Sequence, residues 1–387
     1  MTAEDFEAWF GLVHTPGLTR VSVRRLLQAL GSAQAVLASS AAQWAAVAGP
    51  VAAQALATPD PTAADRLRQA QHWLQAQPDR QALILGDPGY PEPLLHCGDP
   101  PLMLFVQGRA ALLRQPSVAV VGSRQATPQG LAHARQFAAA LSQAGVTVVS
   151  GLAAGIDGAA HEGALDGAGA TVAVIGTGPD LVYPRRHEAL SRRIAQAGAV
   201  VSEYAPGTPA LAHHFPHRNR IIAGLTRGTL VVEANLKSGS LITARLASEC
   251  GREVFAVPGS IQSPQSRGCH ELIRQGAQLV ESAQEILQTL KLTGAPARAA
   301  QCSRDAAQPT ADEEADAGEA GSEADSDART PQARLLRALG HDPVSLDILV
   351  GRTGDPAPVL GARLLELELQ GLVARLPGGR FQRQQPC

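Results

Sequence analysis

The chain has 387 residues, of which 45% are hydrophobic and 18% are charged, and its formal net charge is −2. This composition provides enough apolar residues for two or three domains with hydrophobic cores. No apolar run is long enough to cross a bilayer, which excludes a membrane-spanning helix. The five cysteines form no C-x-x-C pair, and the acidic start "MTAEDFEAWF" does not resemble a secretory signal. We therefore expect a cytoplasmic protein with reduced cysteines and no membrane contact.

The charge is distributed unevenly along the chain. Residues 301–328 hold nine acidic side chains against one basic side chain, Arg304. Without this segment the chain has 32 basic and 26 acidic residues, a net charge of +6. The remainder is therefore mildly basic, which permits a polyanionic partner.

Four segments follow one another in the sequence. Residues 1–75 are rich in Ala and Leu with helical periodicity, as in "RVSVRRLLQALGSAQAVLA", and predict an N-terminal helical domain. Residues 76–292 predict an α/β domain, and residues 331–387 predict a small C-terminal domain. Between these two, residues 293–330 are acidic and nearly devoid of large apolar side chains, so we expect a disordered linker.

The central segment alternates between strand and helix. A helical stretch that ends in Gly, as helices often do, lies between each predicted strand and the next. The predicted strands are 117–121, 146–150, 171–175, 199–202, 229–233 and 253–257. This alternation predicts an α/β fold, a Rossmann-like, doubly wound and mostly parallel sheet. Ligands of such sheets bind outside the carboxyl ends of the strands.

Glycine-bearing loops follow several of these strands. The first reads Gly122-Ser123-Arg124, and it lacks the G-x-G-x-x-G spacing of a dinucleotide site. Gly151 ends the second strand without the acidic residue that would hold a ribose. Glycines let a phosphate approach backbone N–H groups at helix N-termini, and an arginine adds a formal charge. We therefore expect a phosphate-rich ligand anchored by charge and no cofactor.

Further cations and two aromatic residues lie at the same predicted edge. Several phosphate-binding loops in succession favour a polymer over a mononucleotide, while the few aromatic residues make phosphate contacts the main source of affinity. The predicted nucleic-acid-binding residues are Gly122, Ser123, Arg124, Gly151, Tyr183, Arg185, Arg186, Phe215, Arg218, Asn219, Arg220, Lys237, Ser238, Gly239 and Ser240.

Catalytic and metal-binding arrangements are not evident in the sequence. His213, His214 and His217 resemble a metal cluster but lack partners at metalloenzyme spacing. Asp157 and His161 lie four residues apart on a predicted helix, which suits either an acid–base pair or the stabilisation of the helix start. We therefore predict no metal site and no enzymatic activity.

The central motifs resemble those of the DNA-processing protein A family (DprA, also called Smf). They are "VAVVGSRQAT", "VVSGLAAGIDGAAHEGAL", "VAVIGTGPDLVYPRRH", "FPHRNRIIAGLTRGTLVVEANLKSGSLITARLASECGREVFAVPG" and "GCHELIRQGAQLV". The resemblance covers about residues 75–290. It implies a homodimeric protein that binds single-stranded DNA taken up in natural transformation, protects it and loads the RecA recombinase onto it. It also implies DNA contacts by Arg124, by Arg185, by the R-N-R motif 218–220 and by residues 237–240.

The two flanking segments resemble known small domains less closely. The segment "HTPGLTRVSVRRLLQALGS" is similar to a helix-hairpin-helix or sterile-alpha-motif-like unit, but Thr19 replaces the second Gly of its G-x-G, which favours a structural or docking role. The tail resembles a winged helix. Its third helix carries Arg363 against Glu366 and Glu368, an acidic excess that repels phosphate. Either the arginines of its wing contact DNA, or the domain contacts protein.

An alternative function is a nucleotide-binding or nucleotide-hydrolysing enzyme. The lysine-decarboxylase-like phosphoribohydrolases share this kind of sheet, but they carry P-G-G-x-G-T-x-x-E with a glutamate on the helix. Here "KSGSLITARLA" has no carboxylate, and only Glu233 at the preceding strand end is available. A regulatory nucleotide site in the same crevice is a third alternative.

Overall fold

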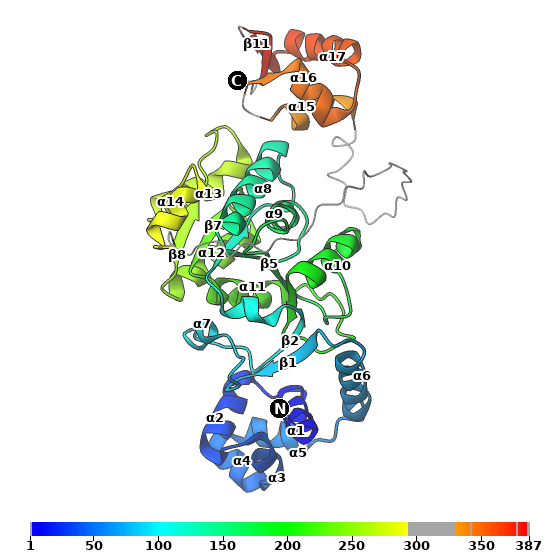
Figure 1. Ribbon diagram of the computed structural model, residues 1–387, viewed down its shortest axis with the longest axis vertical. Helices are drawn as coiled ribbons and strands as arrows, with labels where there is room; N and C mark the ends of the chain where they lie inside the picture. Colours follow the sequence, from blue (N-terminus) through cyan, green and yellow to red (C-terminus); the bar gives the residue numbers. More distant parts are fainter. Residues whose placement is uncertain (1, 293–329, 341–342, 377, 385–387) are drawn as a thin grey trace. The chain divides into compact units, whose positions relative to one another are not determined.

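A computed structural model describes residues 2–292, 330–340, 343–376 and 378–384 (Figure 1). They form two compact units, the first made of most residues up to 292 and the second centred on residues 330–384. The predicted linker, 293–330, lies outside the described residues apart from Thr330. No helix in the described ranges is long and apolar enough to cross a membrane.

A nine-stranded sheet forms the centre of the first unit, in the order β1-β2-β6-β5-β4-β3-β7-β8-β9. The strands are β1 (Arg80–Ile84), β2 (Met103–Gly108), β3 (Ser117–Val121), β4 (Thr147–Ser150), β5 (Thr171–Ile175), β6 (Ala199–Ser202), β7 (Gly228–Val231), β8 (Glu253–Ala256) and β9 (Gln278–Leu279). The run from β6 to β9 is parallel, whereas β2 is antiparallel to both of its neighbours. The fold prediction is therefore confirmed, and β1, β2 and β9 are additional strands.

Helices cover both faces of this sheet, because its strands are apolar on both sides. Val118 and Val120 of β3 pack with one set of helices, and the alternate residues Ala119 and Val121 pack with the other. The first set is α8 (Pro128–Gln143), α9 (Ile156–Ala164), α10 (Glu188–Ala197) and α14 (Ala283–Thr289). The second set is α7 (Glu92–Leu95), α11 (His214–Leu225), α12 (Gly239–Glu249) and α13 (Arg267–Arg274).

The strand order reverses between β3 and β7, which lie side by side in the sheet. It adds β4, β5 and β6 on one side of β3, then returns to place β7 and β8 on the other side. Helices that follow β3 and β7 therefore lie on opposite faces, and their diverging starts leave a crevice at the carboxyl ends of these strands. This is the position at which open α/β sheets bind ligands.

Six helices precede the sheet: α1 (Ala3–Val13), α2 (Arg20–Leu30), α3 (Ala33–Ala38), α4 (Ala41–Ala48), α5 (Pro50–Ala57) and α6 (Ala63–Gln75). Phe10 and Trp73 from these helices share a buried cluster with Met103 and Phe105 of β2. Arg20 and Arg24 of α2 both pair with Asp99. The N-terminal helices therefore belong to the same compact unit as the sheet.

The second unit is a winged helix, as predicted from the tail sequence. It contains α15 (Pro331–Leu339), α16 (Leu346–Thr353) and α17 (Ala357–Leu369), with a three-stranded antiparallel sheet of β10 (Val344–Ser345), β11 (Val373–Leu376) and β12 (Arg380–Arg383). Leucines from all three helices form its core. The β11–β12 turn uses Gly378 and Gly379 at φ +82° and +70°, a conformation that favours glycine.

Candidate nucleic-acid interface

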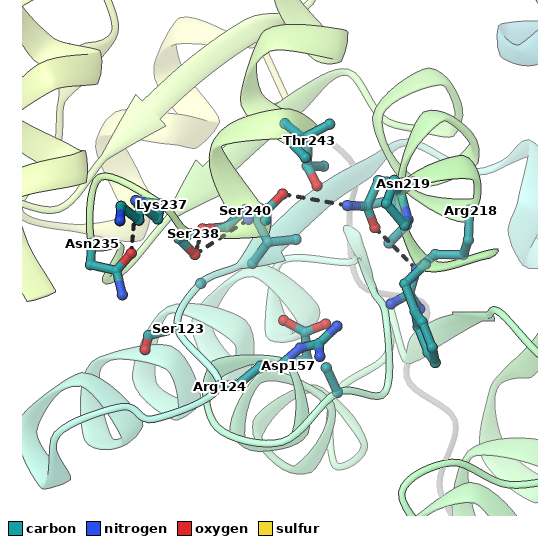
Figure 2. Close-up of a pocket in the computed structure, with 18 of the residues that line it drawn as sticks. Ser123, Arg124, Asp157, Arg218, Asn219, Asn235, Lys237, Ser238, Ser240 and Thr243 are labelled. Atoms are coloured by element: carbon teal, nitrogen blue, oxygen red, sulfur yellow. Dashed lines mark hydrogen bonds between the residues drawn. The ribbon is translucent and has the colours of Figure 1, made fainter. Parts of the chain in front are cut away.

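A cleft of about 470 Å³ lies at the crevice between the ends of β3 and β7 (Figure 2). Its walls come from the loops after these two strands, the start of α9, and helices α11 and α12. Ten of the fifteen predicted binding residues line it: Gly122, Ser123, Arg124, Phe215, Arg218, Asn219, Lys237, Ser238, Gly239 and Ser240. The fold therefore brings together loops that are more than 110 residues apart in the sequence.

The loop after β3 forms one wall of the cleft and is built by close packing. A Cβ atom on Gly122 would lie 2.6 Å from Cγ1 of Ile156 and 2.8 Å from the carbonyl oxygen of Glu233. The Ser123 N–H donates to that same carbonyl at 2.7 Å, and the Ser123 carbonyl accepts from the Ile156 N–H at 3.1 Å. Gly122 therefore lets the loop lie tightly between β7 and α9, and Arg124 is exposed directly after it.

The start of α12 forms the opposite wall. Ser238 caps this helix, and its Oγ lies 2.7 Å from Oγ of Ser240. The Asn235 side chain accepts from the Lys237 N–H at 2.9 Å and thereby shapes the turn that leads into the helix. A Cβ on Gly239 would meet no atom within 4 Å, so its backbone faces open space. Such a helix start, rich in hydroxyl and N–H donors, is suited to bind a phosphate.

The charges that line the cleft are mostly positive. Arg124 and Lys237 are exposed, and neither forms an ion pair with any residue that the structure describes. Asp157 is the only acidic residue among the described residues that line the cleft, and it is buried. The cleft therefore offers a ligand two exposed cations from opposite walls, neither of them ion-paired within the described residues, which favours a polyanion.

Arg218 also lines the cleft, but the residue is only 4% exposed and its guanidinium group is hydrogen-bonded to the protein itself. It donates to the backbone carbonyls of Gly151 and Val174, and its Nε donates to the Asn219 side chain at 3.1 Å. A Cβ on Gly151 would lie 2.5 Å from this guanidinium, which explains the glycine at that position. Arg218 therefore fixes the cleft floor by joining α11 to the ends of β4 and β5.

Burial of Arg218 and Asp157 shifts both of their pKa values. Desolvation lowers the pKa of Arg218 to about 10, and the nearby charge of Asp157 opposes that shift. Desolvation likewise raises the pKa of Asp157, opposed by the charge of Arg218 and by hydrogen bonds from backbone N–H groups. The two buried groups stabilise each other's charged form.

The loop between β4 and α9 is held in an unusual conformation. Leu152 has φ +57°, a left-handed value that is rare for leucine. Its N–H donates to Nε2 of His161 at 3.2 Å, and its carbonyl accepts from Nδ1 of His187 at 2.9 Å. Asp157 accepts from the Gly151 N–H at 3.0 Å. Of the two sequence interpretations of Asp157 and His161, the structure supports the one in which they stabilise the start of α9.

His161 is fully buried and neutral. Its Nε2 accepts from the Leu152 N–H, so its Nδ1 carries the proton and donates to Oγ1 of Thr171 at 2.8 Å. Burial lowers the pKa of His161 to about 3. This imidazole therefore acts as a fixed connector between the loop and β5.

Phe215 lines the cleft, and Tyr183 packs against it from outside the cleft lining. The rings of Tyr183 and Phe215 lie 5.4 Å apart, and Tyr183 is 51% exposed. The Arg124 guanidinium lies over the Phe215 ring at 5.5 Å. A ring and a cation side by side can contact a base and its phosphate together.

A second hollow, of about 290 Å³, adjoins the first through Arg124. Arg186 and His187 contribute to it, and Arg185 is exposed directly before Arg186. The positive surface therefore extends from Lys237 past Arg124 to the turn at 185–187.

Arg220 lies apart from the cleft. It pairs with Glu203, and its Nε lies 3.4 Å from a carboxylate oxygen of Asp99. Its side chain is 12% exposed, and its charge is used against Glu203, which follows β6, and Asp99, which precedes β2.

Some residues of the site were not among the predicted ones. Asn235 and Thr243 line the cleft, while His161 and His187 hold the loop beside it. The N-L-K order at 235–237 is typical of an Asx turn and could have indicated Asn235. Within the described ranges, no three His, Cys, Asp or Glu side chains gather as metal ligands.

Comparisons with known proteins agree with this architecture. The family model described as DNA recombination-mediator protein A matches residues 81–291, and the DprA winged helix domain matches residues 304–379. Protein Smf of Escherichia coli is 42% identical over 321 residues, which are 81% of this chain and 80% of that protein. DNA processing protein DprA of Streptococcus pneumoniae is 50% identical over 201 residues, 52% of this chain and 71% of that protein.

A solved structure is also similar. The X-ray structure of DNA processing protein A from Streptococcus pneumoniae superposes with a TM-score of 0.64 at 39% identity, covering 73% of this chain and 97% of that one. The family model alone spans more than half of the present sequence. The chain therefore belongs to the DNA recombination-mediator protein A family.

Proposed function

We propose that this protein binds single-stranded DNA taken up in natural transformation, protects it and loads the RecA recombinase onto it, without catalysing a reaction. We also propose that it does so in the cytoplasm, as a homodimer. In this proposal residues 76–292 bind the strand, residues 1–75 and 331–387 are accessory domains, and residues 293–330 are a linker. The observation that carries the proposal is the cleft with Arg124 and Lys237 on opposite walls and no ion-paired partner for either among the described residues.

The shape of the site supports a single strand as its ligand. The phosphate donors at the start of α12 and the ring of Phe215 line a concave surface, and the exposed Tyr183 packs beside Phe215. A flexible strand can place its backbone on these donors and turn its bases toward the rings. In a duplex the base faces are stacked inside the helix, and only the base edges are exposed in the grooves. We therefore expect much weaker binding to duplex DNA.

The distribution of carboxylates supports a protein without enzymatic activity. A base-releasing enzyme needs an accessible acidic group at the reacting atoms. Among the described residues that line the cleft, the only carboxylate is Asp157, which is buried beside Arg218. The carboxyl group of Glu233 lies against Gly130 of α8, where a Cβ would be 2.3 Å from its Cδ.

The binding test is fluorescence anisotropy of a labelled oligo-dT strand at several salt concentrations. We expect submicromolar affinity and a negative slope of log K against log salt. Arg124→Ala should lower the magnitude of that slope by about 0.7 to 1, the contribution of one phosphate contact. Arg193→Ala on α10 is the matched control, because Arg193 is exposed and does not line the cleft.

An unchanged slope in Arg124→Ala would contradict the proposed role of this arginine. Release of free base from AMP or CMP by the purified protein would contradict the non-enzymatic part. For the loading step, catalytic amounts of the protein should shorten the lag of RecA ATP hydrolysis on oligo-dT. A lag that stays constant while the protein binds the strand would contradict loading and leave strand binding intact.

A further inference from the structure

The winged-helix unit has a second apolar surface on α17. This helix buries Leu360, Leu364 and Leu367 in the core of the unit. With 3.6 residues per turn, the positions diametrically opposite are Pro358, Ala362, Leu365 and Leu369, all of them exposed. Leu365 is 57% exposed and Leu369 is 82% exposed. A helix that is apolar on both faces is normally buried on both, so this face is suited to a partner.

The spacing of these outward residues specifies the shape of the partner. The intervals are four, three and four residues, which is the a/d repeat of a helix that packs against another helix. Gly361 and Ala362 lie on or beside this seam and add little bulk there, which allows a second helix to approach closely. A partner that packs into this seam is therefore itself a helix with apolar residues at the same spacing.

The charges beside the seam specify the chemistry of the partner. Glu366 and Glu368 occupy positions next to it, on opposite sides, and neither forms an ion pair with a described residue. The basic residue of this helix, Arg363, is already paired with Asp355 at 2.6 Å. The seam is therefore flanked by negative charge, which repels the phosphates of DNA.

The same charges disfavour a second copy of this chain as the partner. Residues that flank a seam face their counterparts on the other helix, so two α17 helices would bring glutamate against glutamate. A helix with Lys or Arg at its flanking positions would instead form opposite-charge pairs. We propose that the outward face of α17 docks a helix of a different protein, with an apolar seam and basic flanks.

The test uses the full chain and three synthetic helical peptides of three heptads each. One peptide has leucines at the seam and Lys at the flanking positions, the second has Glu at the flanking positions, and the third keeps Lys but has Ser at the seam. We expect the first to bind at least about tenfold more tightly than the other two in fluorescence anisotropy. The third peptide controls for attraction between basic peptides and the acidic segment 301–328.

Two variants make the assignment specific. Leu369→Asp should reduce binding of the first peptide by about tenfold or more, and this exposed position lies outside the core. Glu366→Lys combined with Glu368→Lys should reverse the preference, so that the Glu-flanked peptide binds better. Circular dichroism of both variants should match the unaltered chain.

Three results would overturn the proposal. The first is equal binding of the Lys-flanked and Glu-flanked peptides, or of the leucine and serine peptides. The second is no binding of the Lys-flanked leucine peptide up to about 1 mM. The third is a drop in the sedimenting mass of the full chain on Leu369→Asp, which would make a second copy the occupant of this face.

Discussion

Arg218 and Arg124 line the same cleft, but the structure gives them different roles that one substitution can separate. Arg218→Met removes the donors to the carbonyls of Gly151 and Val174 and leaves the charge of Asp157 buried without its partner. An unsatisfied buried carbonyl costs about 1–3 kcal/mol, and removing one partner of a buried charge pair costs about 3–5 kcal/mol. Because the two effects overlap, we expect a loss of about 3–5 kcal/mol in the free energy of unfolding.

Arg124→Met is the matched control for this substitution. Its guanidinium is exposed and contacts Phe215 only through its positive charge over the ring. We expect a change in stability of no more than about 0.5 kcal/mol, together with weaker single-strand binding. Urea unfolding followed by tryptophan fluorescence measures this difference in the first unit, because Trp9, Trp44 and Trp73 all lie there.

The cost of Arg218→Met should also depend on pH. Burial raises the pKa of Asp157 above its ordinary value of 3.8, and loss of Arg218 raises it further. A carboxyl whose pKa is raised in the folded state destabilises the fold as pH rises above 3.8, because the folded state holds its proton longer. The difference between the variant and the unaltered chain should therefore be smaller near pH 4 than at pH 7.

Two outcomes would refute this reasoning. Equal stability losses in Arg218→Met and Arg124→Met would mean that burial of the guanidinium does not distinguish them. A stable Arg218→Met variant that fails to bind DNA would place this guanidinium on the ligand.

Three further substitutions have defined outcomes. Gly155→Ala puts a Cβ 2.2 Å from the Ser123 carbonyl at φ +79°, so we expect about 2 kcal/mol or more of destabilisation in urea unfolding, and a full-stability variant would contradict the packing of this loop. Because burial lowers the pKa of His161 to about 3, the free energy of unfolding should fall as pH drops below about 6.5, by up to about 1.4 kcal/mol per pH unit. His161→Gln should flatten this pH dependence in urea unfolding. An equally steep pH dependence in the variant would assign the effect to other titrating groups. Leu364→Ala should lower the free energy of unfolding of the winged-helix unit by about 2–5 kcal/mol in calorimetry, while the unfolding of the first unit, followed by tryptophan fluorescence, stays unchanged. Leu365→Ala, at an exposed position, should leave both unfolding transitions unchanged.

The parallel core of the sheet could be predicted from the sequence because its strands are apolar on both faces and alternate with helices. All six predicted strands are present, within one or two residues at their ends. The antiparallel strands β1 and β2 were not predicted, because they lie on either side of a stretch of glycines and prolines that gives no periodic pattern. The strand β9 has two residues, too few for a pattern.

The glycine loops of the cleft could be located from the sequence, because strand ends at one edge of a parallel sheet meet in space. The orientation of side chains on α11 could not. Residues 218 and 220 are two positions apart, which is about 200° around a helix, so their side chains point to nearly opposite sides. Arg218 therefore forms the cleft floor, whereas Arg220 pairs with Glu203 away from the cleft. The helix is buried over much of its surface, and its apolar pattern does not indicate which arginine faces the cleft.

Strand β2 places its alternate residues in two different cores. Leu104 and Val106 face the core beneath α7 and α11 on one face of the sheet. Met103 and Phe105 face the other way and are fully buried against α1 and α6. Any shortened chain that begins after residue 75 would leave a methionine and a phenylalanine open to water. Two adjoining apolar side chains on an open sheet face form a patch that favours aggregation, so the leading helices also keep this end of the sheet from associating with other chains.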